Sequence, residues 1–139
     1  MADAATLLAL ADRCEREKPS RKLDVAIFTT IGLRPDQERH CADWCRMNGR
    51  TDLTREHYIE AWAPCFTISR DAAAALQPAR WYVIEIRHLS PRNFYCVLGN
   101  MDREEAQVIG EANTEPMARG AAALRARVFV AEPPTSVSF

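Results

Sequence analysis

The sequence predicts an α+β fold, in which a small antiparallel β-sheet is sandwiched with α-helices. Two runs rich in β-branched and aromatic residues, 81–87 and 94–98, flank a turn-like Ser-Pro-Arg-Asn stretch at 90–93. This pattern indicates a β-hairpin at about residues 80–99. Because a two-stranded ribbon is barely stable alone in water, its apolar side needs cover, which the helical patterns before and after it can provide.

Alternation along the first run divides its side chains between the two faces of the ribbon. One face is expected to carry Tyr82, Ile84 and Ile86, and the other Val83, Glu85 and Arg87.

Three helices are expected before residue 50. Asp3 can cap the first, and Pro19 prevents it from continuing. In the second, at 20–31, Ser20 is a suitable N-cap, apolar residues recur at helical spacing, and Gly32 would end the helix. The β-branched run at 25–31 leaves a strand as the alternative, and we favour the helix. The third begins at Pro35 and ends at residues 48–49.

Shorter elements are expected between residues 50 and 80. A short helix around 58–62 is closed by Pro64. Residues 65–68 are predicted as either a short strand or an extended lead-in. Ser69 is then the N-cap of a brief helix that reaches residue 76.

After the hairpin, residues 99–113 are expected to form a polar connection with a helical turn at 103–108. Thr114 can cap the closing helix. The apolar positions of this helix recur at the spacing of a buried stripe: Met117, Ala121, Leu124 and Val128. We therefore expect a single α+β domain over residues 1–131 and a flexible C-terminal tail at 132–139.

Composition narrows the classes of function. The 139 residues are 47% hydrophobic and 27% charged, which is ordinary for a globular domain. A net charge of −1 gives no overall attraction to nucleic acid or to an anionic membrane. No apolar run approaches the ~20 residues that cross a bilayer, and the N-terminus lacks a basic segment. We expect a cytoplasmic protein without a membrane partner, whose five cysteines are reduced.

Three patches of the sequence resemble the phage ABA sandwich domain, a family of small phage and prophage proteins. RKLDVAI at 21–27 is similar to the family's reLDaaIa, and FTISRDAA at 66–73 is similar to yTaSlDAA. The third patch is Thr114 together with AAALRAR at 121–127. Phe66 and Arg70 stand where the family usually has Tyr and Leu, and residues 34–64 look like an insertion.

The resemblance implies an α+β sandwich and favours the helix at 20–31. It also implies a phage or prophage origin, and hence a bacterial host. The family has no assigned activity and no catalytic residues that could be transferred to this chain.

A zinc site is the sharpest chemical candidate. Zinc prefers about four nitrogen or sulfur ligands, and Cys41 and Cys45 can share one face of a helix. His40, His57 and Cys65 are further candidates. Because the two cysteines lie within a helix beside Trp44 and no second tight pair exists, we favour buried, structural thiols and predict no metal site and no cofactor.

A cysteine nucleophile is a second candidate. It would need Cys65 or Cys96 to contact His57 or His88, which spacing cannot establish. No oxyanion motif accompanies these residues. We therefore predict no catalytic residues.

Two polar groups admit a functional and an ordinary interpretation. Thr67, Ser69 and Asp71 could line a binding edge, although Ser69 is better explained as a helix cap and Asp71 as a partner of the helix dipole. Asp24 is better explained as a solvated or capping carboxylate than as an acid catalyst, because it lacks a partner carboxylate.

A nucleic-acid surface on the hairpin is the remaining alternative. Its basic and aromatic residues would be Arg80, Arg87, Arg92, Trp81 and Tyr95. Glu85 dilutes this charge, and Arg119, Arg125 and Arg127 form no continuous stripe on the last helix.

The function expected from the sequence is therefore a non-catalytic accessory module that binds an unknown protein or small ligand. The alternatives are a zinc-stabilised module and a weak nucleic-acid-binding protein. An exposed Trp44–Tyr58–Trp62 face would indicate that residues 34–64 reach a partner.

Overall fold

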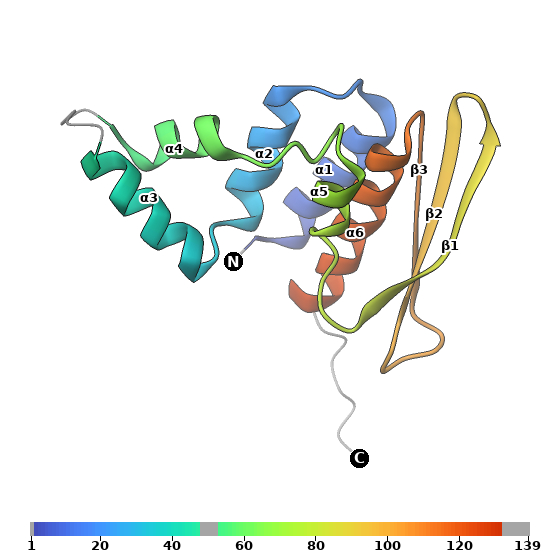
Figure 1. Cartoon of the computed structure of the whole chain (residues 1–139). Helices are drawn as coiled ribbons and strands as arrows, with labels where there is room; N and C mark the ends of the chain where they lie inside the picture. The colour runs from blue at the N-terminus through green and yellow to red at the C-terminus, as the bar shows by residue number, and fades with distance from the viewer. Residues whose placement is uncertain (1, 48–52, 132–139) are drawn as a thin grey trace, which may run out of the picture.

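The computed structural model describes residues 2–47 and 53–131 and confirms the α+β fold. In that part of the chain, helices precede and follow a β-sheet (Figure 1). The helices are α1 (Ala4–Arg16), α2 (Arg21–Ile31), α3 (Pro35–Met47), α4 (Arg55–Trp62), α5 (Arg70–Ala74) and α6 (Glu115–Ala131). The strands are β1 (Trp81–Ser90), β2 (Asn93–Asn100) and β3 (Gln107–Ala112). The predicted tail and the predicted end of the third helix at 48–49 lie outside the described residues.

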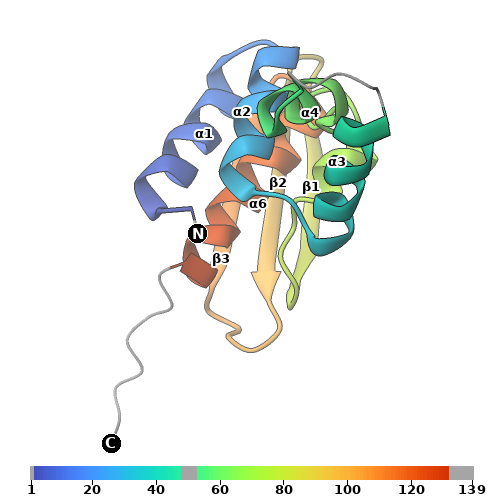
Figure 2. The same cartoon turned by 90° about the vertical axis from the view of Figure 1, so that its left-hand side faces the viewer.

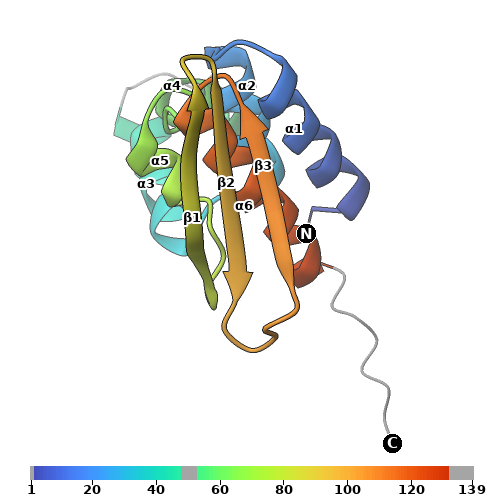
Figure 3. The same cartoon turned by 90° about the vertical axis from the view of Figure 1, so that its right-hand side faces the viewer.

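The predicted hairpin is confirmed. β1 and β2 pair antiparallel around the turn at 90–93, and β3 adds to β2 in the order β1-β2-β3. Figure 3 shows the outer face of this sheet with no helix in front of it, and all the labelled helices lie behind it.

The prediction of a polar connection at 99–113 was wrong, because residues 107–112 form β3. The predicted helical turn is a tight turn in which the Ala106 amide donates to the Arg103 carbonyl at 3.0 Å. Val108, Gly110 and Ala112 are buried, whereas the residues between them are exposed. This alternation is that of a strand, but glycine and alanine supply two of its three buried positions and have low β-propensity.

The prediction that Tyr82, Ile84 and Ile86 share one face of β1 was wrong, because the strand contains a β-bulge. The register shifts between Val83 and Glu85, so Ile84 has no partner on β2. Ile84 therefore lies with Tyr82 on the outer face, where both contact the position of Gly99. Ile86 packs against the core instead of sharing their face.

Helix α6 is the centre of the helical layer. It packs on β2 and β3 with one side and on α1 and α5 with others. At Gly110 the approach is so close that an added Cβ would lie 2.1 Å from the Ala118 carbonyl oxygen. The small residues on the buried side of α6, Ala118, Ala121 and Ala122, allow this contact.

The first two helices form as predicted. The Asp3 side chain accepts the Thr6 amide at 2.7 Å, and the Ser20 hydroxyl accepts the Leu23 amide at 3.1 Å. Gly32 has a φ of 80°, which ends α2 in a conformation that favours glycine. The favoured helix at 20–31 is thus confirmed over the strand.

Helices α3 and α4 form an arm that extends away from the sheet (Figure 1), and Figure 2 views the molecule from the side of this arm. They contact each other, and α4 contacts α2. Arg21 ties the arm to the body, because its guanidinium donates to the carbonyls of Glu60 and Ala63 at the end of α4. The arm occupies the predicted insertion at 34–64.

Residues 65–68 are neither a strand nor an extended lead-in. The chain turns here, and the amides of Ile68 and Ser69 both donate to the Cys65 carbonyl, at 3.2 and 2.9 Å. Ser69 then caps α5 by accepting the Ala72 amide at 3.1 Å, as predicted. The Thr67 hydroxyl fastens this turn to the start of α2, because it donates to the Ser20 carbonyl and accepts from the Ser20 amide.

Candidate ligand pocket

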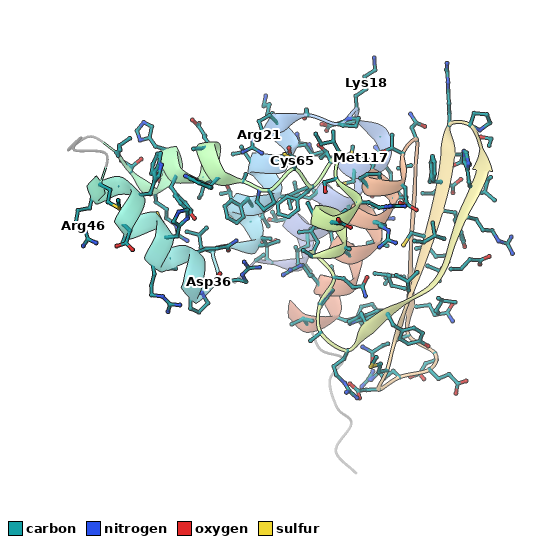
Figure 4. All side chains as sticks on the ribbon, in the orientation of Figure 1. Lys18, Arg21, Asp36, Arg46, Cys65 and Met117 are labelled. Carbon is teal, nitrogen blue, oxygen red and sulfur yellow. The ribbon has the colours of Figure 1, made fainter. Side chains whose placement is uncertain are left out.

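The candidate site is a pocket of about 150 Å³ at the junction between the arm and the body. The end of α2 and the start of α3 form one wall, and the segment around Pro64, α5 and α6 form the other. Figure 4 shows Asp36 at this inner end of α3. The apolar part of the lining is Phe28, Ile31, Leu33, Pro64, Phe66 and Ala75. We refer to this cavity as the junction pocket.

Arg127 brings a positive charge into the junction pocket. It lies on α6, and its Nε donates to the Leu76 carbonyl at 2.8 Å. Burial lowers the pKa of the Arg127 guanidinium, because desolvation disfavours the charged form. In the part of the chain that the structure describes, no carboxylate lies within salt-bridge distance of this guanidinium. The pocket therefore holds a half-buried cation that has no counter-ion among residues 2–47 and 53–131.

Two further donors lie at the α2–α3 side of the pocket. The Gln37 amide oxygen accepts the Arg34 backbone amide at 2.9 Å, which leaves the Gln37 side-chain nitrogen as a donor. The Arg34 guanidinium is paired with Asp36, the Nε to Oδ1 distance being 3.2 Å, and both side chains are largely exposed. The charged and amide side chains that line the pocket, Arg127, Arg34 and Gln37, can thus all donate hydrogen bonds.

This arrangement suits an anion that carries a short apolar body. A guanidinium can donate two parallel hydrogen bonds to a carboxylate, and an amide nitrogen can add a third. The aromatic and aliphatic walls would exclude water from the rest of the ligand. The volume lies below the ~300–1,000 Å³ of pockets for drug-sized ligands, so the group must be small.

The zinc candidates do not converge. His40 Nδ1 lies 2.8 Å from the Tyr58 hydroxyl, and His57 Nδ1 accepts the Thr54 amide at 3.1 Å in a capping box of α4. Cys65 is exposed in the turn after α4. Across residues 2–47 and 53–131, no three or more His, Cys, Asp or Glu side chains are grouped so that they could hold a metal ion.

Cys41 and Cys45 do meet, as their helical spacing predicts. Burial raises the pKa of the Cys41 thiol, and the Cys45 side chain adds to this effect. Cys45 Sγ donates to the Thr54 carbonyl at 3.7 Å, which joins α3 to the start of α4. A pair of thiols alone is half of a zinc site.

The cysteine–histidine pairs that were considered as candidates do not form among the described residues. His57 bonds within its own helix cap, and His88 stacks on Phe94 with ring centroids 4.3 Å apart. Burial raises the pKa of Cys96 to about 11, which opposes the thiolate that a nucleophile requires.

Asp24 and Thr67 are structural. Asp24 is 3% exposed, so the predicted solvated role is wrong, and it accepts the Thr67 amide of a turn at 2.9 Å rather than capping a helix. Thr67 is itself buried, whereas Asp71 is exposed in the first turn of α5. Of the three residues considered as a polar edge, Ser69 caps α5, Asp71 lies in the first turn of α5, and Thr67 bonds to the start of α2.

The basic residues of the hairpin are divided among ion pairs. Arg80 pairs with Asp102 at 2.5 Å, and Arg87 pairs with Glu85. Trp81 is buried against Phe129 rather than presented for stacking. Of the three candidate arginines, Arg92 alone has no carboxylate partner among the described residues, and one cation makes only a small basic patch.

The predicted aromatic face of the arm is only partly exposed. Tyr58 is 2% exposed and lies between Trp44 and Trp62, whereas Trp62 is 48% exposed. The His40 ring packs edge-on to Trp62, with centroids 4.6 Å apart. These rings mainly hold α3 against α4.

Comparisons with known proteins identify no relative. No protein-family model matches the chain, and neither a curated protein nor a solved structure matches it. In the described part of the chain, none of the helices has the length and apolar character needed to span a membrane.

Sequence reasoning missed the junction pocket. Arg127 was considered as one of three arginines that form no continuous stripe on the last helix, and its burial was not predicted. Its position on the stripe-bearing side of α6, three residues after Leu124, was the available signal.

Proposed function

We propose that this protein is a non-catalytic binding module whose junction pocket takes a carboxylate group on a short apolar body. The observation that carries the proposal is the half-buried Arg127 guanidinium, which faces an apolar pocket without a carboxylate partner among the described residues. The phage origin stays a prediction from the resemblance, and the bacterial cytoplasm follows from it.

Desolvation of the Arg127 guanidinium in the junction pocket costs free energy that no carboxylate among the described residues offsets, and a bound anion would offset it. Hydrogen bonds to charged groups contribute about 1.5–3 kcal/mol each, compared with about 1 kcal/mol for neutral pairs. A neutral ligand of the same shape would gain the apolar contacts but not this term. Selectivity for the anion over its neutral isostere is therefore the signature of the proposed site.

The experiment compares butyrate with butyramide, which has nearly the same shape and no charge. Calorimetric titration or NMR shifts of the full chain should detect butyrate binding, and butyramide should bind about tenfold or more weakly, which is the effect of about 1.4 kcal/mol. Equal affinity for the two, or binding of neither, would overturn the proposal.

Two variants and one control locate the site. Arg127→Gln should abolish the preference for butyrate, whereas Arg92→Gln removes the same charge from the hairpin turn and should leave it unchanged. Because Arg127 also bonds to the Leu76 carbonyl, Ala75→Phe provides a second route: this exposed residue lines the pocket, so the larger side chain should block it with the fold intact.

A further inference from the structure

The two edges of the sheet differ in their protection. On β3 the Glu111 amide donates to Glu15 Oε2 at 2.9 Å, and the Ile109 carbonyl accepts Arg125 Nη1 at 2.8 Å. Side chains from α1 and α6 therefore occupy the hydrogen-bonding groups of this edge. An edge covered in this way cannot pair with another strand.

The β1 edge is open by comparison. The Trp81 carbonyl accepts the Gln77 side chain at 2.8 Å, which covers the first residue. From residue 82 to residue 90, no described side chain or loop bonds to the strand backbone. Figure 3 shows β1 at the border of the sheet, with no other strand beside its free edge.

Exposed apolar side chains gather on the same strand. Four of the eleven exposed large hydrophobic residues in the described chain belong to β1, which makes it the most apolar exposed element: Tyr82, Val83, Ile84 and Leu89, at 42%, 37%, 43% and 52%. An exposed edge of this length and composition is a template for strand pairing.

The charges of β1 are self-complementary. Glu85 and Arg87 lie on the same face and form an ion pair within the strand. If a second copy of β1 runs antiparallel about a two-fold axis at Ile86, Glu85 faces the Arg87 of the second copy, and Arg87 faces its Glu85. An axis at residue 85 would oppose two glutamates, and an axis at residue 87 two arginines. The charges thus select one register.

We propose that two copies of this chain pair along β1, with the two-fold axis at Ile86, to form a continuous six-stranded antiparallel sheet. The regular stretch of β1 between its two irregularities, residues 85–88, contains the axis. Both helical layers lie on the same side of the joined sheet. The interface is independent of the junction pocket, which lies in the helical layer behind the sheet.

Sedimentation equilibrium of the full chain tests the proposal. The wild-type chain should show a concentration-dependent monomer–dimer equilibrium. Reversal of one charge, as Glu85→Arg or Arg87→Glu, should weaken the dimer about tenfold, because each reversal replaces two cross-strand attractions with two repulsions. The double variant Glu85→Arg/Arg87→Glu restores opposite charges across the axis and should recover the affinity.

The control is Glu104→Arg, which makes the same charge change at an exposed residue of the turn before β3 and should leave the dimer intact. Thermal unfolding of each variant verifies that the fold is retained. A chain that stays monomeric at every concentration would overturn the proposal, since the bulge at Ile84 would then protect the edge. A dimer that the reversals do not weaken, or that the double variant does not restore, would overturn this register and with it the proposed interface.

Discussion

The buried carboxylate of Asp24 accepts a hydrogen bond from the backbone amide of Thr67, at 2.9 Å. The two residues lie 43 positions apart, in the sequence patches 21–27 and 66–73. The Thr67 hydroxyl bonds to the Ser20 backbone on the same helix end. These patches therefore hold the start of α2 to the turn before α5, across the arm that separates them in the sequence.

Asp24→Ala should lower the free energy of unfolding by about 1–3 kcal/mol, because it leaves a buried amide without an acceptor. Asp24→Asn keeps an acceptor oxygen and should cost less. Urea unfolding measures both. Asp71→Ala, at an exposed residue in the first turn of α5, is the matched control, and an equal loss in Asp71→Ala and Asp24→Ala would contradict the role assigned to Asp24.

Gly110→Ala should destabilise the protein strongly. The new methyl group would lie 2.1 Å from the Ala118 carbonyl oxygen and 2.7 Å from the Ala122 nitrogen, so α6 must move off the sheet. Overpacking of this kind costs typically about 1–3 kcal/mol, and backbone on both sides favours the upper end. Thermal unfolding followed by circular dichroism measures the loss.

Gly120→Ala provides the contrast to this substitution. Its Cβ would meet only Cys14 Sγ, at an ordinary 3.6 Å, and residue 120 lies within α6. A gain of up to about 1 kcal/mol is expected, since alanine favours helices over glycine. If the two alanine variants had the same stability, the close approach at Gly110 would be disproved.

Arg125 and Glu15 should give stability a dependence on acidic pH. The Arg125 guanidinium donates to both Glu15 oxygens, at 2.7 and 2.6 Å, and holds the pKa of Glu15 below its ordinary 4.5. Because the unfolded chain binds this proton more readily, the stabilisation is complete above about pH 4.5 and is lost as the pH falls through the lower, folded pKa.

Arg125→Met should therefore cost about 2 kcal/mol at neutral pH and progressively less below pH 4.5, as measured by urea unfolding over a pH series. Arg13→Met, which breaks the exposed i,i+4 pair with Glu17, should change stability little. A loss in Arg125→Met that stays constant from neutral pH to pH 3 would exclude the Glu15 linkage.

Thiol reactivity should follow burial. Cys65 is exposed, whereas burial raises the pKa of Cys14 to about 12 and that of Cys96 to about 11. At about pH 8, the thiolate fraction of the two buried thiols is on the order of one in a thousand or less, so iodoacetamide should modify Cys65 first and these two last. Mass spectrometry of the digested protein measures the order. All five thiols should react in denaturant, and early labelling of Cys96 in the folded chain would reopen the cysteine-enzyme hypothesis.

The helices and the hairpin could be predicted because their signals are local. Ser20 caps α2, Ser69 caps α5 and Gly32 ends α2, and each acts within a few residues of its own position. β3 escaped prediction because Gly110 is selected by the helix that lies on it rather than by strand propensity. The bulge at Ile84 escaped prediction as well, because alternation assumes one partner per residue and a bulge violates that assumption.

The candidate site could not be predicted from local sequence patterns either, because residues that are distant in the sequence form it. The junction pocket joins residues of α2, α3, α5 and α6 that are up to 99 positions apart, from Phe28 to Arg127. The residues that sequence reasoning selected, such as His57 and Cys65, have the right chemistry but act within their own turns. Sequence reasoning chose candidate residues by their chemical type. The candidate site instead depends on the burial of Arg127, which follows from the tertiary structure.

Helix α6 follows every element that it covers in the chain, and this order matters during synthesis. The ribosome synthesises α1, α5 and the three strands before the helix that fills the space between them. Until α6 packs on the sheet, the apolar face of the sheet lacks its cover. Chaperones that bind exposed apolar segments would then be the first proteins to contact it. A premature stop between the end of β3 at residue 112 and the start of α6 at residue 115 would thus produce a chain that carries the whole sheet without the helix that covers it.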